Sequence, residues 1–275
     1  MTVPPTTATP PPAAAPTGSV RQAGWHVHGV VPADARPPGE GVRLVRHGDV
    51  AALVTEVPPT GWRTGRRLLA HAEVLDRTAA TTAVLPVRFG TVATSLPQVV
   101  ERVLAPHHDT LAAALARLTG RAQFVLRAGY LPDAAVRAVL ADDPRLARWR
   151  GGRHRAGRHG NDRAARLRYG ELVAGAVARR RERDVATIVQ ELGRYAEAVH
   201  VRPYQSLDPD GIGDVALLVD LARRADVESA AERLGQRWRD VARLRLLGPM
   251  AAYHFAGEVV ATGDAVTVPR GSGWD

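Results

Sequence analysis

The sequence predicts an α+β protein of two domains, an N-terminal ferredoxin-like α/β sandwich and a C-terminal ferredoxin-like variant that contains a long helix. The chain has 275 residues, which is more than one typical domain holds. Segments with alternating apolar residues, typical of strands, are interleaved with segments whose apolar residues recur every three or four positions, as on one face of a helix. The break at Leu131-Pro132-Asp133 separates two such sets of segments.

The first set has the order βββαβαβ, which indicates a sheet with both helices on one face. A turn at Gly48-Asp49 joins the second strand to the third. Ser95 and Gln98 form a capping box at the start of the second helix. The expected strands are residues 24–31, 42–45, 50–54, 84–89 and 123–130, and the expected helices are residues 66–80 and 96–118.

The second set has the order αββαββ, in which a long helix takes the place of the first ferredoxin-like helix. This helix begins at Asp162 and reaches about Tyr195. Charged residues 179–184 interrupt its apolar stripe, so the helix either projects beyond the core or kinks there. The other expected helices are residues 133–140 and 227–241, and the expected strands are residues 198–204, 214–221, 244–247 and 253–256.

These segments divide the chain into four parts. A Pro/Thr/Ala tail covers residues 1–23, the N-terminal domain residues 24–131, the C-terminal domain residues 132–257, and a second tail residues 258–275. The first tail lacks the apolar core of a signal peptide, and no window approaches the roughly 18 apolar residues of a membrane span. We therefore expect a soluble cytoplasmic protein without a membrane partner. The absence of cysteine excludes disulfides and thiolate metal ligands.

The least generic stretch of the chain is Ala83–Val92, with the sequence AVLPVRFGTV. Pro86 must lie at the start or edge of a strand, because proline cannot donate a hydrogen bond to a sheet. Arg88 comes where the strand ends. A buried guanidinium needs a partner, so we expect Arg88 to contact a carboxylate or backbone carbonyls.

The eight residues Leu85–Val92 resemble, without a gap, the LPVRFGTV signature of the gas vesicle protein L/F family. In that family a helix precedes the signature, and here the corresponding helix carries His71. The resemblance implies a family motif and a possible partner surface. The residues that carry it are Leu85, Pro86, Arg88, Phe89, Gly90 and His71.

The end of the second domain resembles the closing motif of the same family, Gly-Pro-Trp-Pro-Pro-Tyr-x-Phe. Four residues match, and three residues, Met250-Ala251-Ala252, replace the Trp-Pro-Pro of the family. This departure loosens a rigid turn. The matching residues are Gly248, Pro249, Tyr253 and Phe255. Together with a similar opening strand, the resemblance covers about residues 24–256.

The net charge of +9 is concentrated in one segment, residues 145–168, where nine arginines accompany a single acid, Asp162. Glycines and a weak apolar pattern predict a mobile loop there. Arginines can clamp phosphates with an affinity that falls steeply as salt rises. The chain contains no lysine, so a solvated arginine-rich loop is the simpler interpretation, and an acidic protein fits as well as nucleic acid. The residues that could contact a polyanion are Arg148, Arg150, Arg153, Arg155 and Arg158.

Motifs for nucleotide, phosphate or catalytic zinc binding are absent from the sequence, and no Ser/His/Asp set can be chosen from it. His26 and His28 alternate on a strand and face the same side, which is a geometry that can bind a metal. No acidic residue or third histidine accompanies them at a known spacing, so ordinary strand histidines are the simpler interpretation. We expect no enzyme activity, no cofactor and no metal.

The family resemblance implies a non-catalytic accessory or minor structural protein in the assembly of gas vesicles, the hollow protein-walled organelles of some prokaryotes. It also implies contacts with the hydrophobic shell protein and with other accessory proteins. Two sheet-bearing domains would offer sheet edges and apolar helix faces to such a partner. The alternative is a nucleic-acid-binding module that acts through residues 145–168. The expected location is the cytoplasm, in association with gas vesicles.

Overall fold

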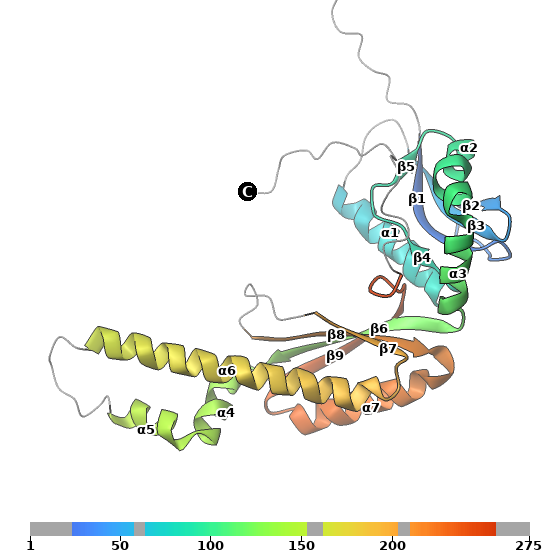
Figure 1. Ribbon diagram of the computed structural model, residues 1–275. Helices are drawn as coiled ribbons and strands as arrows, with labels where there is room; N and C mark the ends of the chain where they lie inside the picture. Colours follow the sequence, from blue (N-terminus) through green and yellow to red (C-terminus); the bar gives the residue numbers. More distant parts are fainter. Residues whose placement is uncertain (1–23, 58–63, 153–161, 203–209, 257–275) are drawn as a thin grey trace, which may run out of the picture.

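The computed structural model describes residues 24–57, 64–152, 162–202 and 210–256, which form two antiparallel sheets with helices packed on each (Figure 1). This content confirms the α+β class. The expected tails, residues 1–23 and 258–275, lie outside the described residues. Among the helices of the described ranges, none has the length and apolar character that crossing a membrane requires.

The first sheet has the strand order β2-β3-β1-β4, and β5 also pairs with β1. The hairpin of β2 and β3 turns at Gly48, whose φ of +58° suits glycine, as the sequence predicts. The strand expected over residues 84–89 is reduced to the short strand β4, and a second short strand, β5, follows the turn at Gly90; both pair with β1. The strands are β1 (Gly24–Pro32), β2 (Val42–His47), β3 (Val50–Val57), β4 (Leu85–Pro86) and β5 (Val92–Ala93).

Helices cover both faces of the first sheet, so the expectation of a single covered face is wrong. Alternate residues of a strand point to opposite faces. On β1, Val31 packs in the cluster that includes Leu75 of α1 (Thr64–Ala79), whereas Val30 packs in the cluster that includes Leu111 of α3 (His108–Leu118). β1 and β3 are therefore central strands with apolar residues on both sides.

The second covering helix is broken, although the sequence predicts one helix over residues 96–118. It begins with α2 (Leu96–Val99), where Ser95 caps the backbone N–H of Gln98 as expected. A π-helical turn, η1 (Val100–Leu104), and a 3₁₀ turn, η2 (Ala105–His107), then lead into α3. The break contains Pro106, which lacks the N–H that an α-helix interior needs.

The strand β6 (Arg121–Tyr130) belongs to the second sheet, although its place in the sequence suggested the first. The second sheet has the order β7-β8-β6-β9, and β6 pairs with β8 and β9 on its two sides. The expected βββαβαβ order of the first unit is therefore wrong. The chain passes between the sheets at Gly120, where a φ of +75° turns it, rather than at Leu131-Pro132-Asp133.

The second sheet is completed by β7 (Ala198–Arg202), β8 (Gly211–Asp220) and β9 (Ala242–Met250). α6 (Asp162–Gly193) and α7 (Arg224–Trp238), which follows the short turn η3 (Leu221–Arg223), pack on one face of this sheet (Figure 1). The largest buried side chains of their shared core include Phe124, Leu192, Leu217 and Leu234. Residues 244–247 lie within β9, but the strand expected over residues 253–256 is a turn.

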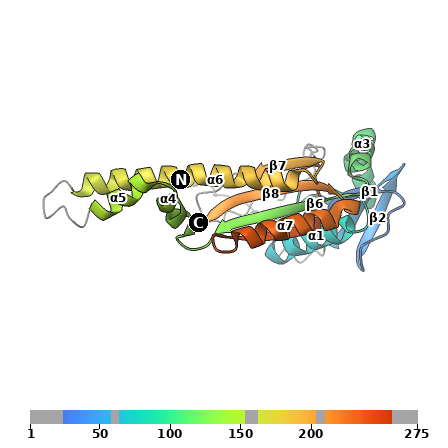
Figure 2. The same cartoon turned by 90° about the horizontal axis from the view of Figure 1, so that it is seen from below.

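α6 is one continuous helix whose first half extends beyond the second sheet, beside α4 (Ala134–Asp142) and α5 (Pro144–Gly152) (Figures 1 and 2). The charged run 179–184 supplies a contact to the sheet. There Asp184 accepts a hydrogen bond of 2.7 Å from the Tyr130 hydroxyl and contacts Arg180 at 3.3 Å. Arg180 also reaches Asp142 of α4 at 2.9 Å. The helix therefore projects without breaking.

The arginine-rich segment is largely helical where it is described, so the expected mobile loop is wrong for those parts. Residues 145–152 belong to α5, and residues 162–168 begin α6. Leu146 is buried and packs α5 onto its neighbours, which a loop-like composition did not reveal. Residues 153–161 lie outside the described residues.

Candidate functional site

Three histidines come together between β1 and α1. His26 and His28 project from the same side of β1, because side chains on a strand repeat every two residues. α1 places His71 against them, and each of the three residues is only 3% exposed. One ring nitrogen of each imidazole lies within 4.8 Å of those of the other two. We call these three residues the histidine cluster.

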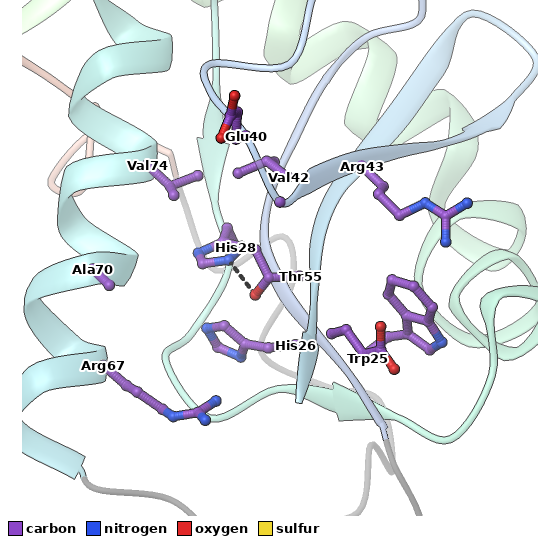
Figure 3. Close-up of a pocket in the computed structure, with 12 residues that line it drawn as sticks. Trp25, His26, His28, Glu40, Val42, Arg43, Thr55, Arg67, Ala70 and Val74 are labelled. Carbon is purple, nitrogen blue, oxygen red and sulfur yellow. Dashed lines mark hydrogen bonds between the residues drawn. The ribbon is translucent and has the colours of Figure 1, made fainter. Parts of the chain in front are cut away.

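The cluster is held by hydrogen bonds to the backbone and to one threonine. His26 Nε2 lies 3.0 Å from His71 Nδ1, and His26 Nδ1 lies 3.1 Å from the carbonyl oxygen of Thr91. His28 Nε2 lies 3.0 Å from the hydroxyl of Thr55, as Figure 3 shows. His28 Nδ1 is buried and has no hydrogen-bond partner among the described residues.

Burial keeps the cluster uncharged. It lowers the pKa of His26 to about 4, that of His28 to about 3 and that of His71 to about 4, because a charged imidazole loses its hydration there. The neighbouring imidazoles lower the pKa of His26 and of His28 further. At neutral pH the cluster therefore consists of three neutral imidazoles.

The local backbone allows this close approach. β1 has a bulge between Val27 and Gly29 where it pairs with β3. A Cβ on Gly29 would lie 2.7 Å from a methyl of Leu75 and 2.8 Å from the carbonyl oxygen of Leu85, so glycine permits both α1 and β4 to approach the strand. The cluster therefore depends on a residue beside it that has no side chain.

The stretch Leu85–Val92 forms one wall of the cluster. The N–H of Val87 donates to the carbonyl of His28 at 2.9 Å, and the N–H of Val27 donates to the carbonyl of Thr91 at 2.9 Å. The ring of Phe89 stands edge-on to those of His26 and His71, with centroids 5.5 and 5.4 Å away. The sequence motif thus has a structural role in enclosing the imidazoles.

A cavity of about 580 Å³ opens beside the cluster. His26, His28 and Thr55 line it from the sheet, and Arg67 and Val74 line it from α1 (Figure 3). The charge of Arg67 contributes to the lowered pKa of His26. The cavity therefore gives small molecules or ions a path to two of the three imidazoles.

The other motif residues differ in burial. Leu85 is buried, Pro86 and Phe89 are half-buried, and Gly90 turns the chain with a φ of +94°. Arg88 is exposed. Its side chain is therefore not buried at a strand end, because β4 ends at Pro86 and the chain turns at Gly90, and the expected contact with a carboxylate or carbonyls stays a prediction. The strand end is held by Thr91, whose hydroxyl donates to the carbonyl of Arg88 at 2.8 Å.

The closing segment joins the two sheets. Gly248 has a φ of +136°, and a Cβ there would lie 2.8 Å from the carbonyl oxygen of Gln123 and from the ring of Phe124. The Gly248–Pro249 peptide bond is cis, and Pro249 is half-buried. Gln123 Oε1, from β6, accepts the N–H of His254 at 2.9 Å.

Both family-like segments meet on α1. The N–H of Ala251 donates to the carboxylate of Asp76 on α1 at 3.2 Å, and Ala251 packs with Leu75 and Val84. Phe255 packs against the core between the first sheet and α3, whereas Tyr253 stays 43% exposed. Burial, with Asp76 nearby, raises the pKa of Tyr253 to about 12. The small residues that replace Trp-Pro-Pro therefore sit in a well-anchored turn.

The arginines proposed for polyanion binding are not brought into one described site. Arg148 is exposed on α5, where its Nε donates to the carbonyl of Pro144 at 3.2 Å. Arg150 also lies in α5, and Arg153, Arg155 and Arg158 lie outside the described residues. Nucleic-acid binding through this segment stays a prediction.

The third histidine is the site residue that the search for a metal motif missed. Sequence analysis assigned His71 to a helix in the family motif but did not connect it with His26 and His28, from which it is separated by two strands. The sequence does contain one indication: His71 lies four residues before Leu75, which is buried, so both side chains lie on the same face of α1.

Comparisons with known proteins agree with this architecture. A family model described as gas vesicle synthesis protein GvpL/GvpF matches residues 24–257. The chain is 31% identical over 221 residues to gas vesicle protein F of Streptomyces sp. strain CB03234, covering 79% of this chain and 89% of that protein. It is 32% identical over 246 residues to gas vesicle protein L of the same strain, covering 83% and 88%.

The fold is similar to that of a solved structure. The crystal structure of the gas vesicle protein GvpF from Anabaena sp. PCC7120 superposes with a TM-score of 0.73 at 21% identity. The superposition covers 86% of this chain and 98% of that one. The likeness therefore extends over both sheets rather than over one of them.

Proposed function

Since this chain belongs to the gas vesicle synthesis protein GvpL/GvpF family, we propose that it takes part in gas vesicle formation as a non-catalytic accessory or minor structural protein. In this role it binds the hydrophobic shell protein and other accessory proteins, in the cytoplasm and on the growing vesicle. One observation carries the proposal: the family match runs over residues 24–257, which include both sheets and the turn that joins them.

The start of α1 supports a contact with an apolar partner. Leu68 and Leu69, near the start of α1, are 49% and 73% exposed. His71, Leu75 and Ala79 are the buried residues of this helix, so the two leucines are not part of the face that packs on the sheet. Two adjacent exposed leucines suit a shell protein that must be kept from aggregating.

The test is co-expression of the shell protein with and without this chain, followed by measurement of soluble shell protein and of its recovery in a pull-down. We expect the chain to raise both quantities. A double variant, Leu68→Asp with Leu69→Asp, should lower recovery severalfold while its melting temperature stays near that of the parent.

The matched control is Leu167→Asp with Leu172→Asp, two leucines of α6 that are 60% and 51% exposed. This control should capture shell protein like the parent. Equal loss in both double variants would contradict the assignment of the surface to α1. Shell protein whose solubility and recovery do not respond to the chain at all would contradict the proposed function.

We also infer a ferredoxin-like variant for the second unit alone. Along the chain its elements run β6, α6, β7, β8, α7 and β9, with α4 and α5 inserted before α6. The sheet order β7-β8-β6-β9 supports the β-α-β-β-α-β motif, in which two crossover helices cover one face.

A further inference from the structure

The hydrogen bonds of His26 determine which of its two ring nitrogens carries the proton of the neutral ring. A carbonyl oxygen can only accept, so the contact with Thr91 places the proton of the neutral ring on Nδ1. Nε2 then carries a lone pair, and it faces His71. His71 also has a hydrogen bond to the backbone of Val87, so the single proton of its neutral ring is shared between that bond and the contact with His26.

His28 leaves a second nitrogen without a partner. Its Nε2 contacts Thr55, while its buried Nδ1 meets no hydrogen-bond donor or acceptor in the described part of the chain. Buried polar atoms are nearly always paired in proteins, so an unpaired one calls for an explanation. The cluster contains three neutral imidazoles, from β1 and α1, and no carboxylate that could pair with His28 Nδ1.

We propose that His26, His28 and His71 bind one divalent transition-metal cation of the Zn²⁺ class, which cross-links β1 to α1. Imidazole nitrogens suit zinc, copper and nickel, whereas calcium and magnesium prefer oxygen ligands. The contact of His26 with the Thr91 carbonyl is the outer-shell bond that orients a metal-binding histidine.

The distances require a small adjustment. Zinc–nitrogen bonds of about 2.0 to 2.1 Å in a tetrahedral site place two ligand nitrogens roughly 3.3 Å apart. The 3.0 Å between His26 and His71 is close to this value, while the three nitrogens together span up to 4.8 Å. The ring of His28 therefore has to move until its nitrogen lies as close to the other two, a shift on the order of 1 Å. The neighbouring cavity leaves room for this shift.

The cavity also defines the fourth coordination position. Three protein ligands with one open position are usual where water or another molecule reaches zinc. Arg67 lines the same cavity, and its positive charge favours an anionic fourth ligand such as hydroxide or a carboxylate over a neutral one. The site is thus a three-histidine site that faces a solvent-accessible space.

The experiment uses the full chain, stripped of metal with a chelator and then titrated with Co²⁺ and Zn²⁺. We expect one equivalent of Co²⁺ to bind with the visible absorption of a nitrogen-ligated, low-coordinate site, and Zn²⁺ to displace it. Zn²⁺ should also raise the melting temperature, because it binds the folded chain preferentially.

The variants His28→Gln and His71→Gln should each weaken Co²⁺ affinity at least tenfold. The matched control is His200→Gln, which removes an exposed histidine of β7 and should bind like the parent. Binding of less than one-tenth equivalent by the parent, or equal affinity in all variants, would overturn the proposal.

The Co²⁺ spectrum of the parent stays decisive even if a histidine variant fails to fold, because it reports the ligands directly. The outcome is also separate from the proposed function. Capture of the shell protein is measured without added metal, so the metal site can be absent while the assembly role holds, and the reverse.

Discussion

Each of the two sheets has a polar cluster against a covering helix, and the two clusters differ in what they lack. In the second unit, Tyr130, Asp184 and Arg180 combine a donor, an acceptor and a cation, and Asp142 completes the set. In the first unit, the histidine cluster contains only neutral bases, and His28 Nδ1 has no hydrogen-bond partner in the described ranges.

The two clusters show that buried polar side chains can have different roles. A cluster whose charges and hydrogen bonds are mutually satisfied fixes one helix against a sheet, here α6 against β6. In the histidine cluster one hydrogen bond joins His26 to His71, while His28 Nδ1 has no partner among the described residues, and this is the feature on which the proposed metal site rests. The first sheet therefore carries the candidate metal ligands, and the second sheet carries the contacts that hold the projecting helix α6.

The largest expected difference is in the pH dependence of stability of the metal-free chain. The folded-state pKa values of the three imidazoles, about 4, 3 and 4, lie below the value of 6.5 for an unfolded chain. As the pH falls below 6.5, the unfolded chain takes up protons first. The free energy of unfolding should therefore be highest above pH 6.5. It should decrease toward pH 4, by on the order of 3 kcal/mol for one imidazole.

Urea denaturation at several pH values across this window measures the effect. His28→Gln should reduce the slope of stability against pH, because it removes one of the titrating groups. His200→Gln, on the exposed edge strand β7, should keep the slope of the parent. A free energy of unfolding that stays constant between pH 6.5 and pH 4 would contradict the burial of neutral imidazoles.

We expect a smaller change in stability when the cluster of Tyr130, Asp184 and Arg180 is disrupted. Asp184→Ala leaves the Tyr130 hydroxyl without its acceptor and removes one of two carboxylates from Arg180. We expect a loss of roughly 1 to 3 kcal/mol in the free energy of unfolding, the usual penalty for an unsatisfied buried group. Equilibrium denaturation near neutral pH, where the histidine cluster is neutral, is the measurement.

The control for that variant is Asp142→Ala. Asp142 contacts the same arginine, but its side chain is 55% exposed, so we expect a change below about 1 kcal/mol. Equal losses in the two variants would show that the Arg180 contacts act as surface ion pairs. The contrast between the two sheets would then rest on the histidines alone.

Sequence periodicity predicted most elements but not how they combine. The hairpin of β2 and β3, the helix α1 and the continuous α6 follow from local apolar spacing and turn residues. The assignment of β6 to the first sheet was wrong, because alternation identifies a strand without identifying its neighbours. The weak apolar pattern of the arginine-rich α5 predicts a loop; the structure explains that pattern, since only Leu146 among the residues of α5 whose burial is described is buried.

The candidate site was only half visible in the sequence. His26 and His28 share a strand, and period-two alternation places them on one side. His71 joins them only because β1 lies beneath α1 and Gly29 lets the two approach, which no spacing in the sequence expresses. The exposure of Arg88 has a related cause: alternation predicts a strand through residue 89, but β4 ends at Pro86 and the chain turns at Gly90.

We expect the smallest change in stability from Arg88→Ala, in the stretch that forms one wall of the histidine cluster. Arg88 adjoins Phe89, yet its side chain is exposed, so Arg88→Ala should change the free energy of unfolding by no more than about 0.5 kcal/mol. A buried, paired arginine would instead give a loss of about 3 to 5 kcal/mol. Phe89→Ala, the matched variant one residue on, should destabilise the chain measurably, because it removes the ring that packs against His26 and His71.

Variants of Arg88 also distinguish a role in packing from a role in partner binding. If its exposed guanidinium belongs to the partner surface of the motif, Arg88→Ala should melt like the parent and lose shell-protein capture in the co-expression assay. A charge contact of this kind should be partly restored by Arg88→Lys and weakened by added salt. Normal melting together with normal capture would exclude Arg88 from the partner surface, and the function of Leu85–Val92 would then be confined to enclosing the histidine cluster.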